Sequence, residues 1–323
     1  MNNVTRERSL QAVTNFDWVE SEVDHLMLSE SSYNLRFEPV STGAQKIPTI
    51  DQFSPYGLTS MAGRIGFPAQ GLSVLKDRGS EDIANEIISR FTTEYLAKGK
   101  DIFVREFGAK IYGFLSDKYS VFDDDKVVDI IKDSGILQNT ESIWYNVNPI
   151  HFHARFIDKE KFTVGDDDSP LSMAVFVDNS MVGAAAFKIR FGIYRHACTN
   201  GCIWGLKEFT ILKERHMGEK DWAGIVANAI SESGEMKEII KQRIIFMQGA
   251  KSAVYGLDED KALAYLKNRL ATSAKTATKI LDFYNNTYGG RTKWDLCNAI
   301  TEASQELPLE NRLTFETKAF IVA

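Results

Sequence analysis

The sequence predicts an α+β protein, in which an antiparallel sheet of hairpins and a meander packs with helices and is followed by a helical C-terminal region. The first observation is a series of strand-like runs between residues 142 and 194, separated by turn residues. The second is a helical spacing of apolar residues from Gly218 nearly to the end of the chain. The third is the segment 191–218, where the β-rich and α-rich parts meet.

Length and composition narrow the class of protein. A chain of 323 residues can bury one large core or two modest ones. An odd number of cysteines, three, argues against a disulfide framework. No apolar run approaches the roughly 20 residues of a spanning helix, and 1–9 is too polar for a secretory signal. We therefore expect a cytoplasmic protein with no membrane partner.

The first third of the chain changes character at Leu58. Residues 1–56 show no sustained period, only possible short strands at 26–28 and 33–37, so we expect an N-terminal arm or lead-in. A short helix then begins at Thr59 or Ser60 and ends at Gly66. A longer helix with an apolar stripe begins at Ser80.

A hairpin and a helix come next. The strands are expected at 102–107 and 111–115, joined by a three-residue loop at 108–110, and 119–122 is expected to extend the sheet. Three aspartates, 123–125, then open a helix. Capping and the helix dipole account for carboxylates at this place better than a metal site does.

The meander is expected to have strands at 143–145, 151–156, 161–164, 171–177 and 184–194, with a turn at 165–170. His151 and His153 alternate, so they share one face. Because a metal site needs three or four converging ligands, we favour a structural role for them. Helices follow at 221–230, 235–247, 259–270 and 294–306, and Ser273 or Thr276 leads into a further helix at 280–284. A closing strand is expected at 315–322. We divide the chain into the arm 1–56, an α+β core domain 57–218 and a helical C-terminal region 219–323.

The charges are unevenly distributed, although the net charge is only −6. Residues 116–178 hold 6 basic and 13 acidic residues, a balance of −7, whereas 187–279 hold 16 and 10, a balance of +6. Such asymmetry can mark a phosphate-binding face, while the alternative is a set of solvated helix faces.

The segment around Cys198 and Cys202 has three interpretations. With His196 and His216 the cysteines could ligate zinc, but their spacing differs from the usual two-residue knuckle. Cys198 could be a reactive thiol activated by its basic neighbours. We favour a structural turn, in which both cysteines are small buried groups around the tight turn Asn200-Gly201. We therefore predict no metal, no cofactor and no catalytic residue, and expect a non-enzymatic protein. The chain has no phosphate loop, dinucleotide fingerprint or nucleophile elbow.

Basic residues surround this segment. Lys188 and Arg190 alternate along an expected strand and form one row if they face outward. Such a row can follow a single-stranded phosphate backbone, with Tyr194 or Trp204 as stacking surfaces if they are exposed. The alternative is a solvated face whose charges pair with nearby glutamates. The further candidate DNA-binding residues are Arg195, Lys207, Lys213, Arg215 and Lys220.

The motif Arg-His-Ala-Cys-Thr-Asn-Gly-Cys at 195–202, followed by Arg-His-Met-Gly at 215–218, resembles a phage and plasmid family. That family is known as domain of unknown function 932, or phage/plasmid-like protein. The stretches 58–68 and 111–128 are similar to it as well, so the resemblance covers about 55–220. It implies a setting in mobile-element DNA metabolism. The layout of the family is similar to that of single-strand annealing proteins, which form rings and hold DNA in a basic groove, an analogy of architecture alone.

From the residues and the resemblance we expect a homo-oligomeric protein that binds or anneals single-stranded DNA during phage or plasmid recombination. The alternative is a phage structural or host-interaction protein that assembles without nucleic acid. In that case the basic segment would meet an acidic surface, such as the 116–178 segment of a neighbouring subunit.

Overall fold

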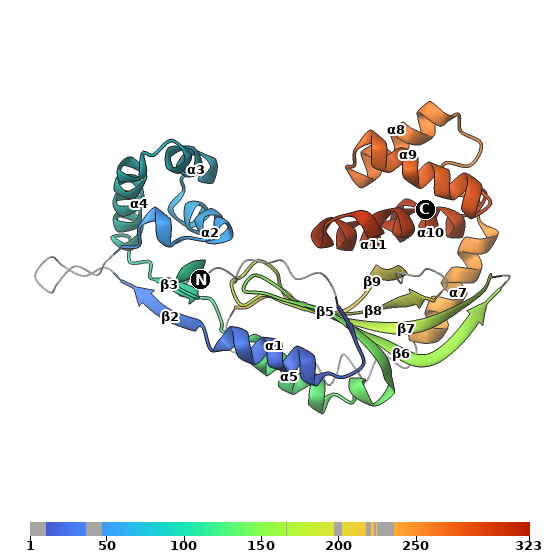
Figure 1. The fold of residues 1–323 in the computed structure, drawn as a ribbon, viewed down its shortest axis with the longest axis horizontal. Helices are drawn as coiled ribbons and strands as arrows, with labels where there is room; N and C mark the ends of the chain where they lie inside the picture. Colours follow the sequence, from blue (N-terminus) through green and yellow to red (C-terminus); the bar gives the residue numbers. More distant parts are fainter. Residues whose placement is uncertain are drawn as a thin grey trace, which may run out of the picture.

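The computed structural model describes residues 11–36, 47–165, 167–196, 202–217, 221, 222, 224 and 236–323. It confirms the α+β class: a six-stranded antiparallel sheet lies beside a three-stranded one, and helices follow at the C-terminal end (Figure 1). In spatial order the large sheet consists of β1 (Gln11–Val13), β5 (Thr140–Val147), β6 (Phe152–Val164), β7 (Asp167–Asn179), β8 (Phe187–Arg195) and β9 (Cys202–Glu214). None of the described helices is long and apolar enough to cross a bilayer.

The meander is built from longer strands than expected. The runs at 151–156 and 161–164 belong to one strand, β6, whose register against β7 shifts between Ile157 and Lys161. A β-bulge of this kind breaks the alternation of side chains. The sequence pattern therefore divides one strand into two.

The small sheet contains β2 (Glu30–Leu35), β3 (Ile102–Phe107) and β4 (Lys110–Ser116), and the expected β3–β4 hairpin is confirmed. Its turn is one residue shorter than predicted, because Lys110 already pairs with Phe107. Gly108 and Ala109 both adopt positive φ, 57° and 64°, as a two-residue hairpin turn requires. The helices α2 (Pro55–Ile65), α3 (Ala69–Asp77) and α4 (Glu81–Leu96) share an apolar core with this sheet.

Helix α2 begins earlier than predicted. Ser54 is its N-cap, with a side chain that accepts a hydrogen bond from the Gly57 N–H, whereas Thr59 and Ser60 lie inside the helix. Pro55 at the first position has the right φ for a helix start, and Gly66 ends the helix in the left-handed conformation, as predicted.

We expect Gly57→Ala to destabilise the protein by about 1–3 kcal/mol, the usual cost of overpacking. A Cβ at this position would overlap the carbonyl oxygen of Ile111 on β4. Urea unfolding measures the change, and Gly63→Ala on the same helix is the control, because its Cβ would meet no atom within 4 Å. Equal midpoints for the two variants would contradict the close approach of α2 to β4.

Residues 11–35, which the sequence places in a loose lead-in, contribute to both sheets. Strand β1 pairs with β5 and β2 pairs with β3. The strand expected at 26–28 is wrong, because Leu26 and Met27 end the helix α1 (Asp17–Met27). Its buried residues Val19, Val23 and Leu26 follow a helical spacing, but one short helix provides only two turns of pattern.

Helices α1 and α5 (Asp124–Asp133) cover one face of the large sheet and share its apolar core. The aspartates 123–125 open α5 as predicted. The sheet extension expected at 119–122 is wrong: Tyr119 makes an isolated bridge with Met217, and 120–123 is irregular. Arg105 on β3 is buried beneath this segment and forms ion pairs with Asp123 and Glu30.

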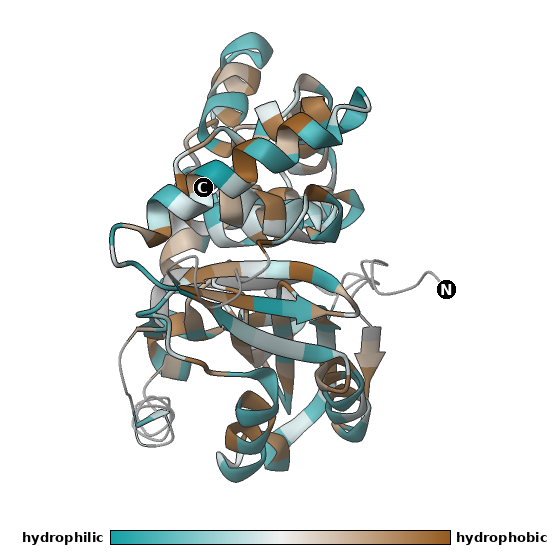
Figure 2. Ribbon diagram, turned by 90° about the vertical axis from the view of Figure 1, so that its left-hand side faces the viewer, coloured by the Kyte–Doolittle hydropathy of each residue, from teal (hydrophilic) through white to brown (hydrophobic). Residues whose placement is uncertain are grey.

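The C-terminal region is helical. Its elements are α7 (Met236–Gly249), α8 (Glu259–Leu270), α9 (Ala274–Asp282), the π-helical turn η5 (Phe283–Thr287), α10 (Lys293–Ala303), η6 (Ser304–Glu306) and α11 (Leu309–Val322). The helix expected at 221–230 lies mostly outside the described residues. Figure 2 shows that these helices carry both hydrophobic and hydrophilic residues, as expected for helices that bury one face.

The closing strand expected at 315–322 is wrong, because these residues form most of α11. Phe315, Ala319 and Val322 are buried at helical spacing and pack into the C-terminal core. Helix α11 also runs along β9. This placement makes the C-terminal helix one wall of the site described next.

Candidate functional site

A cleft of about 1220 Å³ is lined by residues of the large sheet, of α2 and of α11. Figure 1 shows α2 and α11 apart from each other on the same side of the sheet. The floor of the cleft comes from strands β5 to β8, and its walls come from helices far apart in the sequence. The polar and charged lining residues are Tyr56, Asn146, Asn148, His151, His153, Asp178, Asn179, Lys188, Arg190, Arg269, Gln305, Arg312, Thr314, Thr317 and Lys318.

A row of polar residues crosses the floor from β5 to β8 and continues to the exposed Lys213 on β9, which is not part of the cleft lining. The strand register pairs Asn146 with His153, His153 with Asp178, Asp178 with Lys188, and Lys188 with Lys213. Residues directly opposite one another in a sheet point to the same face. The alternation that puts Lys188 and Arg190 on one face of β8 therefore holds, and both line the cleft.

Asp178 is the centre of this row, and both of its carboxylate oxygens are engaged. Oδ1 lies 2.6 Å from His153 Nδ1, and Oδ2 accepts hydrogen bonds from Arg190 Nη2 at 2.6 Å and Nε at 3.1 Å. Burial by itself would raise the pKa of this carboxyl. The charge of Arg190 and the hydrogen bonds from His153 and Arg190 outweigh burial and hold its pKa well below the usual range.

His153 is neutral. Its Nε2 accepts a hydrogen bond from Arg155 Nε at 2.8 Å, so Nδ1 carries the proton that faces Asp178. Burial lowers the pKa of the ring, in agreement with this tautomer. Because Nε2 is occupied by a donor, His153 cannot take a proton from a ligand in this arrangement, and its role is to position Asp178 and Arg155.

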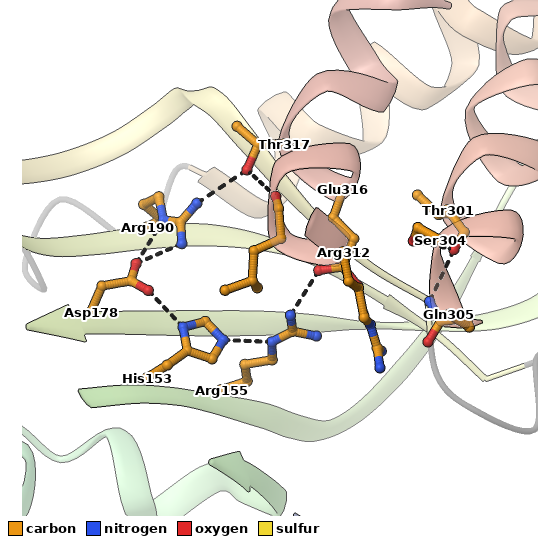
Figure 3. A network of polar contacts seen from close by, with 11 residues as sticks. His153, Arg155, Asp178, Arg190, Thr301, Ser304, Gln305, Arg312, Glu316 and Thr317 are labelled. Carbon is orange, nitrogen blue, oxygen red and sulfur yellow. Dashed lines mark hydrogen bonds and ion pairs between the residues drawn. The ribbon is translucent and has the colours of Figure 1, made fainter. Parts of the chain in front are cut away.

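The same network continues into α11, as Figure 3 shows. Arg155 Nη2 donates to Glu316 Oε2 at 2.8 Å, and Arg312 Nε donates to Glu316 Oε1 at 2.9 Å. Arg155 is 0% exposed and Glu316 is 2% exposed. Arg190 Nη1 also reaches Thr317 Oγ1 at 3.4 Å. Buried charges thus join the C-terminal helix to the sheet.

Lys188 and Lys213 differ from these engaged residues. They lie opposite each other on β8 and β9, and within the described part of the chain neither amine has a hydrogen bond or an ion pair. Both oxygens of Asp178, the nearest carboxylate in the row, are already bonded to His153 and Arg190. Burial lowers the pKa of the half-buried Lys188, and the charges of Arg190 and Lys213 lower it further, against the charge of Asp178, which raises it. The described lining holds five Lys and Arg residues and one Asp, so the cleft is electropositive.

The other candidates from the sequence lie elsewhere. Arg195 is at the far end of β8, where Nη2 donates to Ser169 Oγ at 2.6 Å and the guanidinium lies over the Tyr288 ring. Tyr194 is half-buried and meets His196 edge to face. Arg215 is exposed just after β9. Cys202, Trp204 and Lys207 belong to β9. Lys220, Cys198, Asn200 and Gly201 lie outside the described residues.

The histidines of the zinc interpretation have other contacts. His196 Nε2 lies 2.9 Å from Ser172 Oγ, and His216 stacks on Tyr119 with ring centroids 5.5 Å apart. Among the residues that the structure describes, no three His, Cys, Asp or Glu side chains are grouped to hold a metal ion.

The sequence predicted a binding role for the cleft residues on β8 but for none of the cleft residues on other elements. Arg312 and Lys318 on α11 were assigned to no site, and Lys318 was expected in the closing strand at 315–322. The i,i+4 spacing of Arg312 and Glu316 was an available signal for a helix. Tyr56 and Asn146 offered no local signal, since only the fold brings them to the same cleft.

The family described as Domain of unknown function (DUF932) matches residues 112–308. The match includes the helices after residue 221, for which the sequence motifs gave no resemblance to the family. It does not include the stretch 58–68, for which the motifs did give a resemblance. It covers Lys188, Arg190 and Arg269 of the cleft but neither Tyr56 nor α11. No curated protein matches the chain, and no solved structure does. More than half of the chain matches, so this protein belongs to the family of the domain of unknown function 932.

Proposed function

We propose that this protein binds single-stranded nucleic acid in the cleft without catalysing a reaction, and anneals strands during the DNA metabolism of a phage or another mobile element. The observation that carries the proposal is the position of Lys188, which lines the cleft and lies opposite the exposed Lys213 of β9. Like charges directly opposite each other in a sheet are destabilising. The charge of Asp178 partly compensates Lys188, but both oxygens of that carboxylate already bond to His153 and Arg190. A phosphate between the two lysines would remove the remaining repulsion.

The rest of the cleft supports an anionic ligand longer than a single phosphate. Its cations come from three elements: Lys188 and Arg190 from β8, Arg269 from α8, and Arg312 and Lys318 from α11. Proteins that bind single strands combine such a positively charged groove with aromatic surfaces for the bases. A homo-oligomer would align several copies of the cleft along one strand, as the analogy to annealing proteins suggests.

The test is the fluorescence anisotropy of a labelled single-stranded oligonucleotide at about 50 and 200 mM salt. We expect binding that weakens steeply with salt, because each phosphate contact of a single strand contributes about −0.7 to the logarithmic slope. Lys188→Ala/Lys213→Ala should weaken binding and reduce the slope by about 1.4, or about 0.7 for each lost contact.

The matched control is Lys98→Ala/Lys126→Ala, which removes the same charge from exposed positions outside the cleft. It should leave the slope unchanged. Equal effects of the two double variants would mean that net charge, and not the cleft, determines binding. No binding at either salt, together with assembly in light scattering of nucleic-acid-free protein, would favour a structural or host-interaction protein instead.

A further inference from the structure

The two ends of the cleft differ in chemistry. Every Lys and Arg of its described lining comes from β8, α8 or α11. The lining from α2, from the end of β5 and from the connection between β5 and β6 consists of Tyr56, Asn146, Asn148, Ile150 and His151. This second group contains amides, rings and an aliphatic side chain, and no carboxylate, Lys or Arg. The cationic end suits phosphates, whereas the other end suits an uncharged, flat and polar group.

Asn148 holds the uncharged end in a defined shape. Its Oδ1 accepts hydrogen bonds from the backbone N–H groups of Ile150 at 2.9 Å and His151 at 3.0 Å, and its Nδ2 donates to Asn146 Oδ1 at 2.7 Å. These bonds determine which atom of the amide is nitrogen. One proton of the Asn148 amide then has no partner in the described part of the chain and can be donated to a ligand.

Tyr56, from α2, provides the aromatic surface of this uncharged end. It follows Pro55 at the start of α2, and its half-buried ring packs against the apolar core of the large sheet together with Ile150 and Ala184. Burial raises the pKa of the hydroxyl, which has no hydrogen bond to the described residues. A buried tyrosine hydroxyl usually has a partner.

The floor keeps the two ends apart. Asn146 on β5 and Lys188 on β8 are three strands apart in the same cross-strand row. Neighbouring strands are about 4.8 Å apart, so these residues are separated by roughly 14 Å. One ligand that reaches both ends must therefore carry its negative charge away from its flat polar part.

We propose that the uncharged end takes one unstacked nucleobase, stacked on Tyr56 and hydrogen-bonded by the Asn148 amide, while the phosphates of the same strand lie at the cationic end. This inference rests on the proposed function, which accounts for the phosphates of the ligand, and adds a binding site for one of its bases. All bases have a π-face and a hydrogen-bond acceptor, so the contact tolerates any sequence but requires a base.

The experiment compares an oligonucleotide with an abasic strand of equal length, which has the same phosphates and no bases. Wild-type protein should bind the base-bearing strand more tightly. Tyr56→Leu keeps an apolar group against the core and removes the ring. It should lose about 5- to 150-fold in affinity for the base-bearing strand, the range for one base–aromatic stack. Its affinity for the abasic strand and its salt dependence should not change.

Two further variants separate stacking from damage to the fold. Tyr56→Phe keeps the ring and should keep most of the preference for bases. Tyr255→Leu removes a tyrosine that is 42% exposed and lies outside the cleft, and it should bind as wild type does. Equal affinity of the wild type for both strands, or an unchanged preference in Tyr56→Leu, would overturn the inference and leave the proposed function standing. Absence of binding to either strand would instead refute the proposed function.

Discussion

Replacing Glu316 by alanine is expected to destabilise the protein by about 3–5 kcal/mol, the cost of removing one partner from a buried ion pair. Glu316 is the carboxylate that Arg155 and Arg312 share, and Arg155 is fully buried. Burial lowers the pKa of Arg155 to about 10, so its guanidinium stays charged at neutral pH. Without Glu316 that charge has no carboxylate partner beneath α11. Urea unfolding, followed by circular dichroism, measures the loss.

A double variant distinguishes the lost pair from lost packing. Arg155→Met/Glu316→Leu removes both charges and keeps apolar volume, and such replacements are often neutral or stabilising. It should recover most of the stability lost in Glu316→Ala. If the single and double variants unfold at the same urea concentration, the cost comes from packing of α11 and not from the unpaired Arg155.

The second large effect concerns Asp124, and here we expect a gain: Asp124→Asn should stabilise the protein at pH 8 by up to about 4 kcal/mol. The pKa of the Asp124 carboxyl is raised from 3.8 to about 7. Burial is the largest cause and the charges of Asp123 and Asp125 add to it, whereas the hydrogen bond from Asn179 and the charge of Arg105 oppose it. Its Oδ2 and the Oδ1 of Asn179 are both buried without a hydrogen-bond partner in the described structure.

The direction of this pH dependence follows from the linkage between proton binding and folding. The folded state holds the Asp124 proton more tightly than the unfolded state does, so unfolding releases a proton between pH 3.8 and about 7. Below this pH window Asp124 is protonated in both the folded and the unfolded state, so its carboxyl does not lower the stability. Between pH 3.8 and about 7 the free energy of unfolding of the wild type falls as pH rises. Above about pH 7 the whole of this loss remains, because the buried carboxyl is ionised. An asparagine cannot ionise, so its advantage should be absent at pH 4 and complete at pH 8.

Urea unfolding at pH 4, 6 and 8 tests this dependence. Asp125→Asn is the control, because it removes a charge from the same first turn of α5 at an exposed position. It should change stability by less than about 1 kcal/mol, the usual size of a helix-dipole contribution. A constant difference between Asp124→Asn and wild type across this pH range would show that Asp124 is ionised throughout it.

Local signals in the sequence determined much of the fold. The β3–β4 hairpin is specified by Gly108 between two strand-like runs, the start of α5 by its aspartates, and the start of α8 by the Asp258 cap. Each signal acts over a few residues, where propensity and capping decide the conformation. The same reasoning placed Lys188 and Arg190 on one face of a strand and related the chain to its family.

Only the tertiary structure showed that α1 and α11 are helices and which residues line the cleft. Both helices are short, and burial of one face against the rest of the protein stabilises such helices more than propensity does. The cleft depends on strand register, which sets Lys188 beside Lys213, and on the pairing of Arg155 with Glu316, 161 residues away. Contacts at that separation depend on how the whole chain packs, so no local pattern in the sequence encodes which cations share the site.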